Sequence, residues 1–557
     1  MNGQETGRLC GLPRHFVFDT RGNAIRACLA VCLLTALTSL LFGQDANWDL
    51  RNYHLYNGWA ALHDRLAIDL APAQLQSYFM PWLDVGYFLL AVKGSPLLAA
   101  AVLGALHGLA FVAVTMVAWL TLEGDARRPS LAPLLALAGC LGSAMFLSEL
   151  GNSMGDNTTA PLIIGALALA LHAARTDAAR HWLLAGLLLG LALALKLTNA
   201  PYALGLGVAA LVTRGHWTRR LCGAALMTVA AALVFALVAG PWFWRMYQQF
   251  GNPLFPQFNH WFGSPLALPL PNNDTGHLPK NAVQMLTWPL LIVADPRRIS
   301  ELGMYQLVWS ALYLLAAWAI VQAVLRRAGR GWTGLPAPNR LAARMLAAFV
   351  MVSLAAWTAV FSIHRYLIAL ELLAPLALWL LARHALPTAS AEKWAAGLIA
   401  VCAVTGCAAV RNWGHEGWAQ RGFTVEVPFM EQPSTATVLF VLDEPQAWRI
   451  PFLPRQAAYI GIATNLPGSL GYEERARQIA AERGGKVHAL FPGAQKGAPC
   501  RCALQKASDQ NHALIENAQT HLHTRGWQLQ PESCTVHAST IGSSNYPFHW
   551  CEVTRLP

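Results

Sequence analysis

The stretch that decides the fold is residues 24–57, which are AIRACLAVCLLTALTSLLFG followed by QDANWDLRNYHLYN. The first part is apolar apart from Arg26 and a few hydroxyl groups, and it has the length of about 20 residues that a helix needs to cross a bilayer. The second part is polar and aromatic, with Asp45, Trp48, Asp49 and Arg51 close together. Because polar aromatic segments at the end of a span favour the membrane interface, we expect this segment at the membrane surface.

Composition indicates that this first apolar run is one of many. Of the 557 residues 55% are hydrophobic and only 12% are charged, which is too little polar surface for a water-soluble globule of this size. A signal peptide is the alternative for the first run, but the run is too long and has no small-residue cleavage site before Gln44. We predict eleven spans, at 24–43, 96–122, 131–148, 158–174, 181–195, 200–213, 221–240, 304–325, 342–362, 366–382 and 394–410.

The distribution of basic residues predicts the orientation. The run at 200–213 is short. Merging it with the run before it would reverse the predicted orientation of every later span. With eleven spans and residues 1–23 in the cytoplasm, the cytoplasmic segments hold twice as many Arg and Lys residues as the longer outer loops that connect the spans. The segment from Asn412 onward has 12 basic and 12 acidic residues, so the net charge of +11 lies among the spans and does not indicate a nucleic-acid partner.

The predicted organisation is a membrane domain at 24–410 followed by an extracytoplasmic domain at 411–557. Two outer loops, 44–95 and 241–303, are too long to be simple turns and are expected to have a function. The C-terminal segment alternates strand-like runs at 435–442 and 486–491 with helix-like runs at 473–482 and 513–524, which predicts an α/β domain with its own small core.

Cysteine positions agree with this sidedness. Seven of the 11 Cys lie in or beside the apolar runs, whereas Cys500, Cys502, Cys534 and Cys551 lie in the C-terminal domain. Four thiols on an oxidising side predict two disulfides. Cys500 and Cys502 are too close to bridge readily, so we expect each to pair with Cys534 or Cys551. A zinc site is the weaker alternative, because the C-x-C spacing is unusual and no His lies at ligand spacing.

The densest polar chemistry follows the first span. If a helix begins near Trp48, then Asp49, Tyr53 and Asn57 lie on one face at i, i+4 spacing. A carboxylate held by aromatic side chains at the membrane surface could accept a proton from a hydroxyl group. The structural alternative is that Asp45 and Asp49 cap an interfacial helix. Its aromatic belt would then be formed by Trp48, Tyr53 and Tyr56.

These residues and several later motifs resemble the GT-C superfamily, the multi-span glycosyltransferases that use polyprenyl-phosphate sugars and include protein O-mannosyltransferases and lipid A aminoarabinose transferases. The resemblance covers about residues 24–385; the segment from 411 resembles no member. Many members have Asp-Glu at the key position, whereas here Leu50 follows Asp49. The motifs are Asp49 with Tyr53, Asp69-Leu70-Ala71-Pro72, residues 190–198 (GLALALKLT), residues 240–245 (GPWFWR) with 251–256 (GNPLFP), and His364-Arg365-Tyr366.

The resemblance implies roles for individual residues. Asp49 would be the general base that activates an acceptor hydroxyl, and cations at the outer ends of spans would stabilise the phosphate leaving group. Snorkelling to the interface is the structural alternative for each of these cations. The predicted substrate-binding residues are Tyr53, His54, Asn57, Asp69, Asp156, Lys196, Arg245 and Arg365.

Two further acids are candidates. Asp156, on a short outer loop, would orient substrate or, together with Asp49, hold a divalent cation if one is used; its alternative is an N-cap for the span at 158. Glu371 lies within a span, where an acid is costly and often functional, but pairing with a neighbouring His or Arg would also explain it.

The sequence therefore predicts a polytopic α-helical glycosyltransferase of the bacterial inner membrane, with its C-terminal domain in the periplasm. Its expected partners are a polyprenyl-phosphate-linked sugar donor, a glycan, lipid or protein acceptor, and membrane lipids. One rival is a transporter or flippase of a lipid-linked sugar, for which only Glu371, His107 and His172 are suitable intramembrane groups. The other is a non-catalytic membrane assembly protein.

Overall fold

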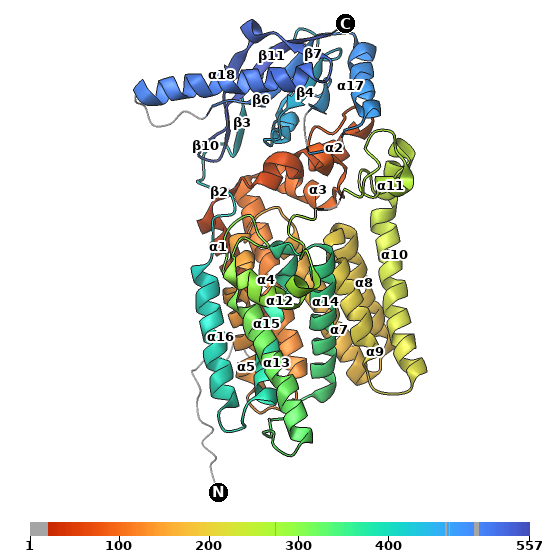
Figure 1. Cartoon of the computed structure of the whole chain (residues 1–557), viewed down its shortest axis with the longest axis vertical. Helices are drawn as coiled ribbons and strands as arrows, with labels where there is room; N and C mark the ends of the chain where they lie inside the picture. Colours follow the sequence, from red (N-terminus) through yellow and green to blue (C-terminus); the bar gives the residue numbers. More distant parts are fainter. Residues whose placement is uncertain (1–19, 273, 463–464, 467, 495–500, 557) are drawn as a thin grey trace.

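A computed structural model describes residues 20–272, 274–462, 465–466, 468–494 and 501–556, without the side chains of 501–507. Long helices form a bundle, and the C-terminal domain lies across one end of it (Figure 1). We call this end the domain side. The outer-loop helices α2 (Leu55–Leu62) and α3 (Trp82–Phe88) lie between the bundle and the domain.

Every predicted span coincides with one helix except 131–148, which is divided between α5 (Arg128–Gly142) and α6 (Ala144–Ser148). Eight of the described helices are long and apolar enough to cross a membrane, and α8 and α9 are shorter apolar helices, so the chain is a polytopic membrane protein whose count of eleven spans stays a prediction. The helices that match the predicted spans are α1 (Arg21–Phe42), α4 (Pro96–Thr121), α5 (Arg128–Gly142) with α6 (Ala144–Ser148), α7 (Asp156–Thr176), α8 (Ala179–Leu195), α9 (Ala200–Leu211), α10 (Trp217–Phe250), α13 (Leu307–Arg327), α14 (Arg340–Val360), α15 (Ile368–Ala385) and α16 (Ala391–Ala408).

Small residues bring the first helices close together. On α4, Gly104 and Gly108 face α1, where an added Cβ would lie 2.7 Å from the Thr35 carbonyl oxygen and 2.4 Å from the Thr35 hydroxyl oxygen, respectively. Membrane helices pack tightly through such pairs of small residues four positions apart. The position of α1, and hence of the polar segment that follows it, depends on this contact.

The C-terminal domain is built on one mixed sheet, as the alternating pattern predicted. Strand β4 (Thr437–Val441) pairs in parallel with β5 (Ala458–Ile462) and with β6 (Val487–Pro492). Helices α17 (Leu470–Arg483) and α18 (Arg501–His523) match the two predicted helical runs. The sheet continues through β11 (Phe548–Arg555) to β7 (Trp527–Leu529), and a smaller sheet contains β10 (Ser544–Asn545), β9 (Ser539–Ile541) and β3 (Phe423–Val425).

The core of this domain includes side chains from outside the domain. Side chains alternate along β4, so Val438 and Phe440 contact one cluster and Leu439 and Val441 another. Both clusters contain residues of loop 44–95. Strand β1 (Gln44–Asp45) also pairs with β2 (His415–Glu416). Loop 44–95 thus contributes to the domain core on both faces of the main sheet.

The predicted pairing of cysteines is also wrong. A disulfide joins Cys534 to Cys551, whose Cα atoms are 4.1 Å apart, because β8 (Thr535–His537) pairs with β11 and brings the two residues together. Cys500 and the side chain of Cys502 lie outside the described residues. We expect mass spectrometry of non-reduced peptides to recover the Cys534–Cys551 pair. Recovery of either residue linked to Cys500 or Cys502 instead would contradict this connectivity.

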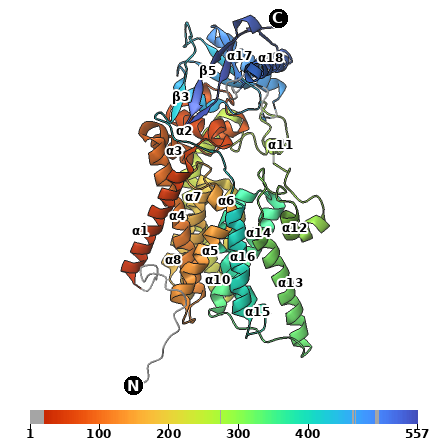
Figure 2. The same cartoon turned by 90° about the vertical axis from the view of Figure 1, so that its left-hand side faces the viewer.

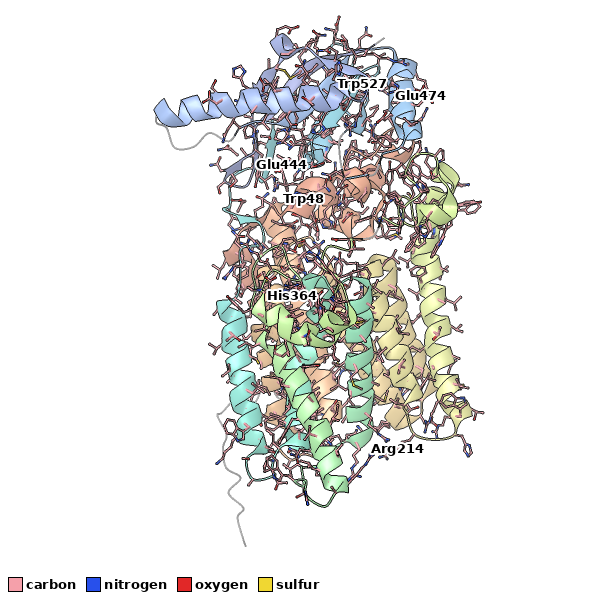
Figure 3. The ribbon with its side chains drawn as sticks, viewed as in Figure 1. Trp48, Arg214, His364, Glu444, Glu474 and Trp527 are labelled. Atoms are coloured by element: carbon pink, nitrogen blue, oxygen red, sulfur yellow. A yellow bond between two sulfur atoms is a disulfide. The ribbon has the colours of Figure 1, made fainter. Side chains whose placement is uncertain are left out.

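The structure permits a direct test of the predicted orientation. Arg214, expected in the cytoplasm, lies at the opposite end of the bundle from Trp48 (Figure 3). We expect reporter fusions after Arg220, Arg344 and Lys393 to report the cytoplasm, and a fusion after Pro557 to report the outer side. A cytoplasmic signal from the C-terminal fusion would overturn the eleven-span topology.

Candidate functional site

Asp49 lies where the chain leaves α1. The expected helix does begin at Trp48, but residues Leu50–His54 form a π-helical turn before α2. Because of this turn, Tyr53 and Asn57 have different partners. The Tyr53 hydroxyl donates to Asp49 over 3.4 Å, whereas the Asn57 amide donates to the Gln76 carbonyl. Asp49 makes no helix-capping hydrogen bond. The predicted face of Asp49, Tyr53 and Asn57 is therefore split, and π-helical turns of this kind often occur at functional sites.

Asp49 forms a shielded ion pair with Arg365. The Arg365 Nη1 atom lies 2.7 Å from Asp49 Oδ2, and both side chains are largely buried. Burial by itself would raise the pKa of Asp49, but Arg365, His54 and Lys196 together lower this pKa below its usual value. Asp49 is therefore a carboxylate at neutral pH. The Nε–H of Arg365 has no partner among the described residues, so the guanidinium retains a free donor.

A second ion pair lies beside the first. Lys196, just after α8, places its ammonium 2.5 Å from Asp156 and 2.7 Å from the Met154 carbonyl oxygen. Asp156 is in the first turn of α7, but the N-cap is Gly155, so the capping alternative does not describe Asp156. The Tyr366 ring links the two pairs, because Lys196 Nζ and Arg365 Cζ each lie 5.4 Å from its centroid.

Glu149 is a site residue that the sequence analysis missed. Its side chain is fully buried, and neither carboxyl oxygen has a hydrogen-bond partner among the described residues. Burial, followed by the charge of Asp156, raises the pKa of Glu149 well above its usual range. In the sequence, the only indication that Glu149 belongs to the site is its position in the same short segment as Asp156.

His54 belongs to the wall of this site. Its Nδ1 atom lies 2.6 Å from Asp84 of α3, while its Nε2 atom has no partner among the described residues. Burial raises the pKa of Asp84, although His54 opposes this. Figure 3 shows Trp48, which precedes Asp49, beneath the domain, and His364, which precedes Arg365, at the domain-side end of the bundle. The site thus lies between the two parts of the molecule.

Two predicted substrate-binding residues, Asp69 and Arg245, lie elsewhere, and a third, Asn57, lies between the two places because its side chain also neighbours Asp84. Asn57, Asp69 and Arg245 line a separate recess with room for about one water molecule, about 20 Å³. Arg245 pairs there with the exposed Asp64. Asp69 accepts hydrogen bonds from Arg65, from the Tyr56 hydroxyl and from the Tyr459 backbone N–H, so its oxygens hold loop 44–95 against the C-terminal domain.

The remaining candidates are accounted for by their neighbours. In the described part of the chain no three His, Cys, Asp or Glu side chains are close enough to hold a metal ion. Glu371 lies 2.6 Å from His364 and accepts from the Ser143 hydroxyl at 2.5 Å, which is the pairing that would explain a buried acid. His107 accepts from the Gly151 N–H and contacts the Thr158 hydroxyl, and the His172 ring packs on His181.

Comparison with known proteins identifies the fold. No protein-family model matches the sequence, and no curated protein matches it either. The structure is similar to that of ArnT from Cupriavidus metallidurans bound to undecaprenyl phosphate, with a TM-score of 0.51 and 15% identity over 95% of this chain and 98% of that one. It is also similar to the arabinofuranosyltransferase AftD from Mycobacteria, with a TM-score of 0.50 and 14% identity over 95% of this chain and 40% of AftD.

These observations define a polytopic membrane protein with a sheet domain on one side and a buried cluster of carboxylates and cations beneath that domain. Both similar proteins are GT-C glycosyltransferases. The chain therefore has the GT-C fold, as the resemblance in its sequence implied.

Proposed function

We propose that the protein transfers a sugar from a polyprenyl-phosphate donor to an acceptor hydroxyl on the outer face of the bacterial inner membrane. The observation that carries this proposal is the pair of adjacent ion pairs, Asp49–Arg365 and Asp156–Lys196, buried beneath the C-terminal domain. In such a transfer a carboxylate accepts the proton of the acceptor hydroxyl, and cations stabilise the phosphate leaving group.

Asp49 acts as the general base in this mechanism. The acceptor oxygen attacks the anomeric carbon of the donor sugar, and the acceptor proton passes to the Asp49 carboxylate. The bond between that carbon and the phosphate oxygen breaks, and its electron pair leaves with polyprenyl phosphate. Lys196 and Arg365 stabilise the negative charge that remains on the phosphate.

The Asp49–Arg365 ion pair suggests how binding of the donor would activate Asp49 as the base. An incoming phosphate competes with Asp49 for Arg365, whose Nε–H is available. Once Arg365 turns to the phosphate, Asp49 loses its strongest cationic neighbour, and the pKa of Asp49 rises toward that of a more effective base. The donor therefore activates the group that later accepts the proton.

The fold and the placement of the site support this assignment. ArnT, which has the same fold, was crystallised with undecaprenyl phosphate, a polyprenyl phosphate of the class that the proposed reaction releases. The proposed acceptor is a glycan, a lipid or a protein, and it would reach Asp49 from the domain side. In the predicted topology that side faces the periplasm.

A cell-free assay tests the proposal directly. Membranes containing the full chain would be incubated with radiolabelled polyprenyl-phosphate sugars and a panel of glycan, lipid and protein acceptors. We expect at least one acceptor to become labelled, and membranes with the Asp49→Asn variant to label it far less. Transport of intact lipid-linked sugar into the opposite leaflet, without labelled acceptor, would favour the flippase alternative.

Truncation of the cations should weaken donor binding. A hydrogen bond to a charged group contributes about 1.5–3 kcal/mol, so Lys196→Ala and Arg365→Ala should each raise the Kd for polyprenyl phosphate by about 10- to 100-fold and also lower turnover. The binding can be measured by equilibrium titration of purified protein. Arg51→Ala is the control, because Arg51 pairs with the exposed Glu444. A Kd for polyprenyl phosphate that is unchanged in both variants would show that these cations do not hold the phosphate.

A further inference from the structure

A second polar pocket lies apart from Asp49, at the edge of the bundle. It is formed by α12 (Ala282–Ala294) and the loop that follows it. Figure 2 shows α12 beside the domain-side end of α13. With 13 residues α12 is too short to span a bilayer. Its Val283 and Leu286 side chains are 71% and 68% exposed, so this helix presents an apolar surface outward.

The pocket has a volume of about 290 Å³ and is strongly basic. Lys280, Arg297 and Arg298 line it, with Asp295 as the one carboxylate among the lining residues. Arg298 pairs with Asp295 at 3.1 Å. No ion pair is recorded for Lys280 or Arg297 with any residue in the described part of the chain, so the pocket carries an excess of positive charge.

Two buried donors in the wall of this pocket have no acceptor. Trp288 is only 3% exposed, and its indole Nε1–H makes no hydrogen bond within the described residues. The Nε–H of Arg298 also makes no hydrogen bond within the described residues. The guanidinium carbon of Arg298 lies 5.9 Å from the centroid of the Trp288 ring. A buried donor without a partner costs free energy, which a bound anion would recover.

We propose that this pocket binds the phosphate group of a membrane lipid. Positive charge and unused N–H donors select a phosphate. The outward apolar side chains of α12 would lie in the acyl region of the membrane, which places the adjoining pocket at the level of the headgroups. Lipid binding in this pocket is independent of the proposed sugar transfer.

The pocket is nevertheless connected to the candidate site. The Ile299 carbonyl, next to Arg298, accepts a hydrogen bond from the His364 backbone N–H at 2.7 Å. Residue 364 precedes Arg365, which pairs with Asp49. A lipid held in the pocket would therefore restrain the segment that carries Arg365.

Native mass spectrometry of the purified full chain, titrated with lipids in detergent, tests the proposal. The probes are phosphatidylglycerol, a polyprenyl phosphate, inorganic phosphate and a neutral glycolipid without phosphate. A basic residue at a membrane surface contributes about a fivefold gain in affinity for anionic lipid, so the Lys280→Gln/Arg297→Gln double variant should bind phosphatidylglycerol about 25-fold more weakly. The Arg340→Gln/Arg344→Gln variant, which removes two exposed charges from the start of α14, should bind as the wild type does.

A milder variant guards against misfolding. Trp288→Phe keeps an aromatic ring in the pocket wall while it removes the five-membered ring of the indole with its N–H donor, and we expect it to weaken phosphatidylglycerol binding about fivefold. Preference for phosphatidylglycerol or for polyprenyl phosphate would support the proposal and identify the source of the phosphate. Equal binding of the neutral glycolipid, binding of inorganic phosphate alone, or equal affinity in the wild type and both pocket variants would overturn it.

Discussion

Asp49→Asn is expected to reduce turnover by about 10²- to 10⁴-fold, the contribution typical of a general base. The amide has the size of the carboxylate, and its oxygen can still accept a hydrogen bond from Arg365, but it cannot take a proton from the acceptor. Donor binding should not weaken, because the phosphate no longer competes with a carboxylate for Arg365. Turnover and donor Kd should be measured on the same purified preparation.

Asp64→Asn is the matched control for this variant. Asp64 is in the same outer loop but is exposed and pairs with Arg245 outside the candidate site. It should retain wild-type turnover. Full turnover of Asp49→Asn together with lower thermal stability would instead assign Asp49 a structural role. In that case Asp156, which pairs with Lys196, would become the better candidate for the base.

The second large effect is expected at Asp69, on stability. Its carboxylate pairs with Arg65 at 2.5 Å, and both side chains are at most 2% exposed. Removal of one partner of a buried pair leaves the other charge uncompensated, at a cost of about 3 to 5 kcal/mol. Asp69→Ala should therefore loosen loop 44–95 from the C-terminal domain. Limited proteolysis over a urea series, followed on the full chain, measures this loss.

Glu444→Ala provides the comparison for Asp69. The Arg51–Glu444 pair also joins the loop to the domain, but Glu444 is half exposed, so its loss should cost about 0 to 1 kcal/mol. Asp69→Ala should be cleaved at clearly lower urea concentration than Glu444→Ala. Equal resistance of the two variants would show that the buried pair does not hold the loop. The same result would leave Asp69 available for the substrate role predicted from the sequence.

The helices and the domain sheet could be predicted because their signals are local. Apolar runs such as 24–43 and 96–122 coincide with α1 and α4, since the length and hydropathy of a segment decide whether it suits a membrane. Alternating strand and helix patterns likewise located β4, α17 and β6. The core of the domain was not predictable in this way, because it depends on apolar side chains of loop 44–95 nearly 400 residues away in the chain.

The sequence by itself determined that this is a multi-span membrane protein with a sheet domain, and it singled out Asp49, Asp156, Lys196 and Arg365 by residue type and position. Only the tertiary structure decided how they pair: Asp49 and Arg365 are 316 positions apart, and Asp156 and Lys196 are 40 apart. It also separated Asp69 and Arg245 from the site and added Glu149. Hydropathy depends on a few neighbouring residues, whereas an ion pair requires two helix ends to meet, and that depends on the packing of the whole bundle.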